Sequence, residues 1–199
     1  MSEKPILFNG KMVRAILEGR KTQTRRVIKP QPVYDSFIHL GAGISGLWRG
    51  YPADQTIPIW EAYCPYGRPG DQLWVRETFC PVDDREFGGK EWVDYRATPK
   101  YSSEHPAGWE IEPGNPNALK WKPSIFMPRK FSRIQLEITG VRVERIQEIT
   151  DEDIVAEGGC IYGAGAWEWF IPLWDGINAK RGFSFESNPW VWVVEFRVL

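Results

Sequence analysis

The sequence predicts an α+β domain built on a curved antiparallel or mixed sheet or barrel, with two or three short helices and long loops. Apolar residues alternate through the segment Arg133–Ile149, which is typical of strands with one buried face. Two short apolar segments are preceded by helix-capping residues. Sixteen prolines and nineteen glycines in 199 residues indicate many turns and disfavour a helical bundle.

The N-terminal segment predicts a strand followed by a short helix. "KPILF" (Lys4–Phe8) is a strand candidate, and Asn9 can cap a helix that runs to about Glu18. Gly19 is a plausible residue to end this helix. Its predicted apolar face contains Met12, Val13, Ile16 and Leu17. The following "LEGRKTQTRRVIKP" is, by composition, a basic loop.

The middle of the chain predicts two further strands. "QLWVRETF" (Gln72–Phe79) follows a turn, and its alternation places Trp74 and Arg76 on one face and Glu77 on the other. "KEWVDYRA" (Lys90–Ala97) is a second strand candidate. "HLGAGISGLWRGYP" and the Pro- and Gly-rich residues 102–116 are predicted to be loops. The lone G-x-G of the first segment lacks the strand-to-helix context of a phosphate site.

The C-terminal part predicts strands, a capped helix and a second helical segment. Gly140 marks a bulge or bend within the alternating segment. Thr150 is the expected N-cap of a helix that ends at Gly158. Residues 167–182 are predicted to be helical or partly helical with an interruption at Pro172, and residues 188–199 form a closing strand.

Charge and cysteine usage limit the function classes. The net charge is −1, so no overall field attracts a polyanion. Residues 11–29 nevertheless hold seven Lys or Arg and one acid, which is compatible with a nucleotide ligand or with an ordinary solvated surface. Three cysteines without metal-ligand spacing indicate reduced thiols in a cytoplasmic protein. No apolar segment is long enough for a signal peptide or a membrane span.

Conventional catalytic sets are mostly absent from the sequence. The two histidines, His39 and His105, lie in loop-like regions, so we expect neither a metal nor a cofactor. Lys21 and Thr24 remain, because a neutral lysine can take the proton of a threonine hydroxyl. Nearby cations, Arg20, Arg25 and Arg26, would lower the lysine pKa. Three residues is an odd step, so the two side chains meet only where the chain turns. If they do not meet, Lys21 is a cation at the end of the helix and Thr24 is an ordinary strand residue.

"GRKTQTRR" resembles the G-x-K-x-x-T-x-R signature of the ASCH domain, a PUA-like β-barrel family. Its four positions are occupied by Gly19, Lys21, Thr24 and Arg26. "PGDQLWV", "EITDEDIVAEGG" and "WVVEFRVL" resemble later elements of the family in order, and the longer pattern resembles ASCH proteins of phages and prophages. The resemblance implies a single domain over residues 1–199 with insertions at about residues 33–68 and 83–122.

The resemblance implies a metal-free amidohydrolase that removes the acyl group from N4-acetylcytidine or a related modified nucleoside. Lys21 would accept the proton of Thr24, which attacks the acetyl carbonyl. Glu157 matches the family glutamate and would orient Lys21 or pass a proton to the leaving amine. Glu77 is a competing acid. The characterised relatives are about half this length, so the insertions could reshape the pocket.

Five residues are candidates for substrate contact. Arg26 could hold an oxyanion or a phosphate, and Trp74 could stack on a pyrimidine. The other three are Glu77, Arg76 and Arg129. For four of them a structural role is the alternative: Trp74 in the core, Arg26 and Glu77 in salt bridges, and Arg129 as a solvated loop residue.

Other functions compete with the hydrolase. A non-catalytic RNA-binding PUA-like module would use the basic residues for phosphates. An ASCH-type ribonuclease is a further alternative, as is a phage accessory protein with a vestigial pocket. The expected partner in each binding function is a modified nucleoside or RNA, in the cytoplasm of a bacterial host. The sequence leaves the oligomeric state open.

Overall fold

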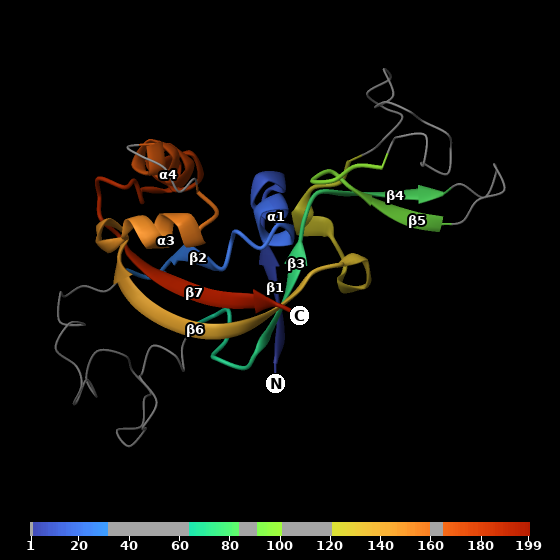
Figure 1. The fold of residues 1–199 in the computed structure, drawn as a ribbon, viewed down its shortest axis with the longest axis horizontal. Coiled ribbons are helices and arrows are strands. Elements are labelled where there is room, and N and C mark those ends of the chain that lie inside the picture. The colour runs from blue at the N-terminus through green and yellow to red at the C-terminus, as the bar shows by residue number, and fades with distance from the viewer. Residues whose placement is uncertain (1, 32–63, 84–90, 101–120, 160–164) are drawn as a thin grey trace.

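The computed structural model describes residues 2–31, 64–83, 91–100, 121–159 and 165–199. It confirms the α+β class and a curved, mixed sheet (Figure 1). The strands are β1 (Glu3–Leu7), β2 (Gln23–Val27), β3 (Gln72–Arg76), β4 (Phe79–Asp83), β5 (Glu91–Tyr95), β6 (Gln135–Arg145) and β7 (Trp190–Val198). The α-helices are α1 (Gly10–Leu17), α3 (Asp151–Ala156) and α4 (Gly165–Asn178). Short 3-10 turns are η3 (Ser124–Phe126), η4 (Arg129–Phe131), η5 (Ile146–Glu148) and η6 (Ala179–Arg181).

The main sheet has the strand order β1-β3-β6-β7-β2. β1 and β3 are parallel, and the other neighbours are antiparallel. The long strands β6 and β7 curve together across the molecule (Figure 1). β1 and β2 are the outer strands in this order, yet a side chain links them, because Arg26 Nη2 on β2 donates to the Leu7 carbonyl of β1 at 2.9 Å.

Capping confirms the predicted first helix. The Asn9 side chain accepts a hydrogen bond from the Met12 amide at 3.0 Å, and Gly19 adopts a φ of 72°, a value that favours glycine. Met12, Val13 and Ile16 are buried against the sheet. Leu17, predicted on the same face, stays 46% exposed at the end of the helix.

The predicted bulge and the predicted cap near the C-terminus are also confirmed. The β6–β7 register shifts between Ile138 and Gly140. A side chain at Gly140 would begin 2.6 Å from a Glu195 carboxylate oxygen, so a larger residue there would displace the Glu195 side chain. Thr150 caps α3 in a reciprocal capping box with Asp153.

The structure corrects three local predictions. The segment predicted as one strand from Gln72 breaks after Arg76, and β4 leaves the main sheet to pair with β5 in a separate hairpin (Figure 1). The basic loop contains a strand, β2, because its backbone pairs with β7. α4 runs through Pro172 without interruption. Pro172 has no amide proton to donate to the Glu168 carbonyl four residues earlier. Both residues lie on the exposed face of the helix, so water can bind that carbonyl.

Strand β7 is buried on both faces, which places the core on two sides of the sheet. Trp190, Trp192, Val194 and Phe196 belong to a cluster with α1, whereas Val191 and Val193 pack with α3 and α4. The helical layers are therefore fixed relative to each other through one strand.

The predicted loops at residues 39–52 and 102–116 lie outside the described residues, and the proposed insertions remain a prediction. Within the described part of the chain, no helix combines the length and apolar character that a bilayer crossing requires.

Candidate active site

The segment between α1 and β2 is held against the ends of two helices. The Lys21 amide donates to the Ala15 carbonyl at 3.0 Å, and the Thr22 amide donates to the Ala156 carbonyl at 2.9 Å. Lys21 and Glu157 form an isolated β-bridge. Residues 136 positions apart in sequence are thus placed side by side.

Lys21 is buried with all three ammonium protons bonded to oxygen. Nζ donates to the Gln23 carbonyl at 2.7 Å, to the Glu157 carbonyl at 2.9 Å and to Glu157 Oε2 at 2.6 Å. Burial lowers the pKa of Lys21, and the charges of Arg26 and Arg25 add to this, whereas the Glu157 carboxylate opposes it. The result is a lysine that gives up its proton more readily than an exposed one.

Glu157 joins Lys21 to a second buried cation, Arg25. Arg25 Nη1 donates to Glu157 Oε1 at 3.3 Å, and its Nη2 donates to Asp153 Oδ2 at 2.8 Å. Arg25 also pairs with Glu144. Each Glu157 carboxylate oxygen therefore faces a different cation, which holds the carboxylate in one orientation.

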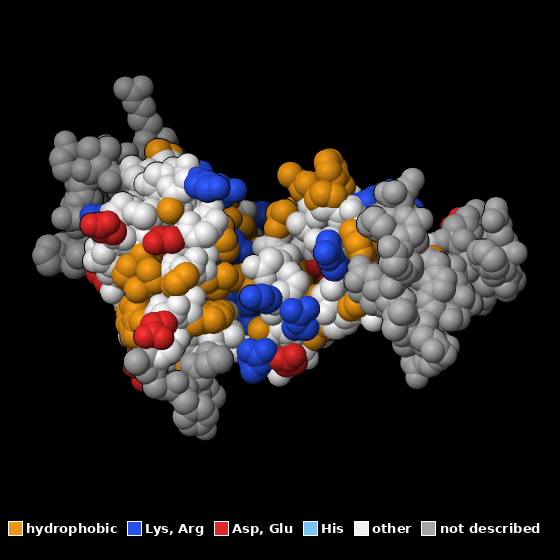
Figure 2. All heavy atoms as spheres, turned by 90° about the horizontal axis from the view of Figure 1, so that it is seen from above, with side chains coloured by type: hydrophobic (Ala, Val, Ile, Leu, Met, Phe, Trp, Pro, Cys, Tyr) orange, Lys and Arg blue, Asp and Glu red, His pale blue; other side chains and the backbone are white. Residues whose placement is uncertain are grey.

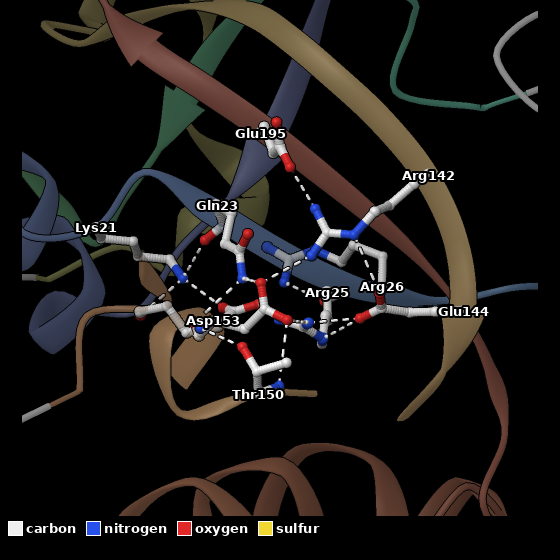
Figure 3. Close-up of polar contacts among 10 residues, drawn as sticks. Lys21, Gln23, Arg25, Arg26, Arg142, Glu144, Thr150, Asp153 and Glu195 are labelled. Atoms are coloured by element: carbon white, nitrogen blue, oxygen red, sulfur yellow. Dashed lines mark hydrogen bonds and ion pairs between the residues drawn. The ribbon is translucent and has the colours of Figure 1, made fainter. Parts of the chain in front are cut away.

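Behind Arg25, further polar side chains complete the network drawn in Figure 3. Arg142 bridges Asp153, Glu144 and Glu195. Gln23 Nε2 donates to Asp153 Oδ1 at 2.9 Å. Burial works against ionisation of Asp153, but the Gln23 hydrogen bond and the charge of Arg25 keep its pKa below the ordinary value. Asp153 therefore stays a carboxylate that anchors Arg25.

Thr24 is buried and its hydroxyl is unused. Only 1% of the residue is exposed, and Thr24 Oγ1 has no hydrogen-bond partner among the described residues. Buried hydroxyls without a partner are uncommon in native structures. Lys21 Nζ donates to three other oxygens, and no hydrogen bond joins it to Thr24 Oγ1.

Thr24 and Glu157 both line a cavity of about 640 Å³. This volume suits a small ligand. Four cations, Arg25, Arg26, Lys29 and Arg181, line it together with aromatic residues. Figure 2 shows basic side chains gathered around a hollow on this side of the molecule. The aromatic residues of the lining are Phe8, Tyr66, Phe170 and Trp174.

Arg26, the last residue of the signature, lies at the cavity wall. Nη1 and Nη2 donate to the carbonyls of Arg25 and Leu7 at 3.1 and 2.9 Å, and the guanidinium lies 5.2 Å from the Phe8 ring centroid. These bonds use two of its five N–H groups. The signature thus contributes Thr24 and Arg26 to the cavity and Lys21 to the layer behind it.

The remaining predicted substrate contacts do not line this cavity in the described structure. Buried Glu77 accepts two hydrogen bonds from Arg133, at 2.8 and 3.0 Å, and that guanidinium stacks 4.0 Å from the Tyr95 ring centroid. Arg76 lies over the Trp74 ring at 5.2 Å. Arg129 pairs with Glu3 at the surface.

Arg25 is the residue that sequence reasoning missed. We treated it, with Arg20, as a flanking cation, and only Arg20 fits that description, since it is exposed and pairs with Glu18. The strand period offered a signal, because Gln23 and Arg25 alternate with Thr24 and Arg26. Both histidines lie outside the described residues, and within those residues no group of three His, Cys, Asp or Glu could hold a metal.

No protein-family model and no curated protein matches this sequence. Two solved structures are similar to the chain. One is an ASCH domain from Lactobacillus crispatus JV V101, with 13% identity, a TM-score of 0.42 and coverage of 99% of this chain and 79% of that one. The other is protein EF3133 (DUF984) from Enterococcus faecalis V583, with 11% identity, a TM-score of 0.43 and coverage of 100% and 77%. These likenesses assign no function to the chain.

Proposed function

We propose that this protein is an amidohydrolase that removes an acyl group from the exocyclic amine of N4-acetylcytidine or a closely related modified nucleoside. Thr24 is the nucleophile, Lys21 its base and Glu157 the proton carrier. The observation that carries the proposal is that Thr24, whose buried hydroxyl has no partner among the described residues, lines the same cavity as Glu157, the carboxylate that pairs with Lys21.

The first step is activation of Thr24. Lys21 holds three protons, so it must lose one before it can act as a base. Glu157 Oε2, at 2.6 Å from Nζ, is the available acceptor. Burial lowers the pKa of Lys21 and so favours the neutral pair. The neutral Lys21 amine then gives up one of its present hydrogen-bond partners, approaches Thr24 Oγ1 and takes the proton of the Thr24 hydroxyl.

The second step is transfer of the acyl group. Thr24 Oγ1 forms a bond to the acyl carbon, and Arg26 donates to the developing oxyanion. The C–N bond breaks as Glu157 returns its proton to the exocyclic nitrogen, which leaves as the amino group of cytidine. Lys21 then passes a proton to Glu157 again and becomes neutral. Water attacks the Thr24 ester while Lys21 takes the water proton. The bond between Thr24 Oγ1 and the acyl carbon breaks, Glu157 gives its proton to Oγ1, and the carboxylic acid product leaves.

A non-catalytic nucleotide-binding role is the second candidate. Arg26, Lys29 and Arg181 line the same cavity, and Glu157 is the only acid among its described lining residues. Because Lys21 and Arg25 already pair with Glu157, the cavity favours an anion. This role needs no free hydroxyl at Thr24.

One comparison separates the two roles. Purified protein is incubated with N4-acetylcytidine, and cytidine is measured by chromatography. We expect turnover that Thr24→Ala lowers at least about a hundredfold, since the nucleophile is removed. Thr22→Ala is the matched control, because Thr22 is an exposed threonine two residues away. It should react like the wild type.

Two outcomes contradict the hydrolase proposal. One is the absence of turnover in folded wild-type protein, with folding checked by circular dichroism. The other is equal turnover by Thr24→Ala. Binding of nucleotides that falls with added salt, without turnover, would instead support the binding role.

A further inference from the structure

Next to the cavity, the turn η3 holds two large apolar side chains in solvent. Ile125 is 59% exposed and Phe126 is 69% exposed. Ser124, the residue before them, lines the cavity. Figure 2 shows exposed hydrophobic side chains beside the hollow. An apolar pair at the mouth of a polar cavity is typical of a binding surface.

The backbone of this turn is held in place. Arg76 Nε donates to the Met127 carbonyl at 3.0 Å, and Arg76 Nη2 donates to the Ile125 carbonyl. The Phe126 amide donates to the Pro123 carbonyl at 3.0 Å. Met127, fully buried, anchors the end of the turn. The backbone that carries Phe126 is thus already ordered before a ligand binds.

The surroundings indicate the chemistry of that ligand. The cavity lining combines cations (Arg26, Lys29 and Arg181) with Leu7 and Ile177, which are 43% and 44% exposed. A ligand that covers both kinds of group carries negative charge together with flat apolar faces. Single-stranded nucleic acid has this combination, since its phosphates pair with cations while its bases stack on aromatic rings.

We propose that Ile125 and Phe126 form a stacking platform for the nucleotide beside the target base, so that the substrate is acylated cytidine within single-stranded RNA. This inference rests on the proposed function for the reaction in the cavity. RNA is favoured over DNA because the acylated nucleoside of that reaction is a ribonucleoside. A duplex is disfavoured because its bases are already stacked on each other and unavailable to Phe126.

The test compares two substrates. The wild type and Phe126→Ala are given free N4-acetylcytidine and a short single-stranded RNA that contains one such residue. We expect Phe126→Ala to lower kcat/KM on the RNA about tenfold more than on the nucleoside, which is the usual size of one lost base stack. Phe126→Trp should restore the RNA activity. Leu199→Ala, which removes a similarly exposed side chain at the C-terminus, is the control and should have no effect.

Binding gives a readout that does not need turnover. Fluorescence anisotropy with an unmodified single-stranded RNA should show about tenfold weaker binding by Phe126→Ala. If neither substrate reacts but this loss is seen, the platform stands and the proposed hydrolase falls. If the nucleoside reacts and RNA binding is unaffected by Phe126→Ala, the platform is wrong and the hydrolase stands. Equal binding of DNA or tighter binding of a duplex would also overturn the proposal.

Discussion

Two glutamates of the described structure are buried, Glu157 and Glu77, and they make a direct comparison. Both are almost fully buried, and both form ion pairs. Glu157 faces a lysine and lines a cavity, whereas Glu77 faces Arg133 and is not among the described residues that line that cavity. A lysine can lose its proton when buried, but an arginine keeps its charge. Both sites thus bury an acid. They differ in the cation that the acid faces and in whether the acid lines the cavity.

The supports of the two acids differ as well. Each Glu157 oxygen faces a separate cation, Lys21 or Arg25, at the end of a short helix. Both Glu77 oxygens are taken by one guanidinium that stacks on Tyr95. Two independent partners allow one to change its protonation while the other holds the carboxylate. A bidentate arginine pair has no such freedom, which is typical of a structural ion pair.

The largest expected difference is in activity. Glu157→Gln should lower kcat at least about a hundredfold, because the amide cannot take a proton from Lys21. Glu77→Gln should leave kcat nearly unchanged. Both variants are assayed on N4-acetylcytidine. A larger loss in Glu77→Gln than in Glu157→Gln would reverse our assignment of the acid.

The ion pair of Glu77 should instead matter for stability. Arg133→Met leaves Glu77 buried without its cation, and we expect a loss of about 2 kcal/mol in the free energy of unfolding, reduced by the partial exposure of Arg133. Urea unfolding measures this. Arg129→Met is the control, because its pair with Glu3 is exposed and should contribute less than about 1 kcal/mol. Similar losses in the two variants would contradict a structural role for Glu77.

The pH dependence of stability should come from the Lys21 site. Burial lowers the pKa of Lys21 below its ordinary 10.5, so between the lowered value and 10.5 the unfolded chain binds more protons than the folded one. The unfolding free energy of the wild type, relative to Lys21→Met, should therefore rise with pH in that window, by at most about 1.4 kcal/mol per pH unit. A relative stability that falls as the pH rises would mean that Glu157 raises the lysine pKa above 10.5.

The smallest expected effect concerns the helix that holds Glu157. Thr150→Ala removes the cap on the Asp153 amide and should cost about 1 kcal/mol of stability. Since Asp153 also binds Arg25, a modest fall in kcat should accompany it. Thr150→Ser keeps the cap oxygen and is the control. A loss of stability with full activity would show that Asp153 does not position the site.

Local features of the fold were predictable because they depend on neighbouring residues. Asn9 and Thr150 cap helices as their types and positions indicate, and Gly140 forms the bulge. The alternation of apolar residues along β6 indicated which face of this strand is buried. The signature Lys21 and Thr24 was also visible in the sequence, with Glu157 reached through the resemblance.

Long-range partners required the tertiary structure. The Lys21–Glu157 contact spans 136 positions, and the pairing of β2 with β7 turned a basic loop into a strand. Arg25 looked like a flanking cation because its acids lie more than a hundred residues away. Sequence patterns record helix and strand periods, but they do not record which buried charges meet. That depends on how β6, β7 and α3 pack, and this packing distinguishes Glu157 from Glu77.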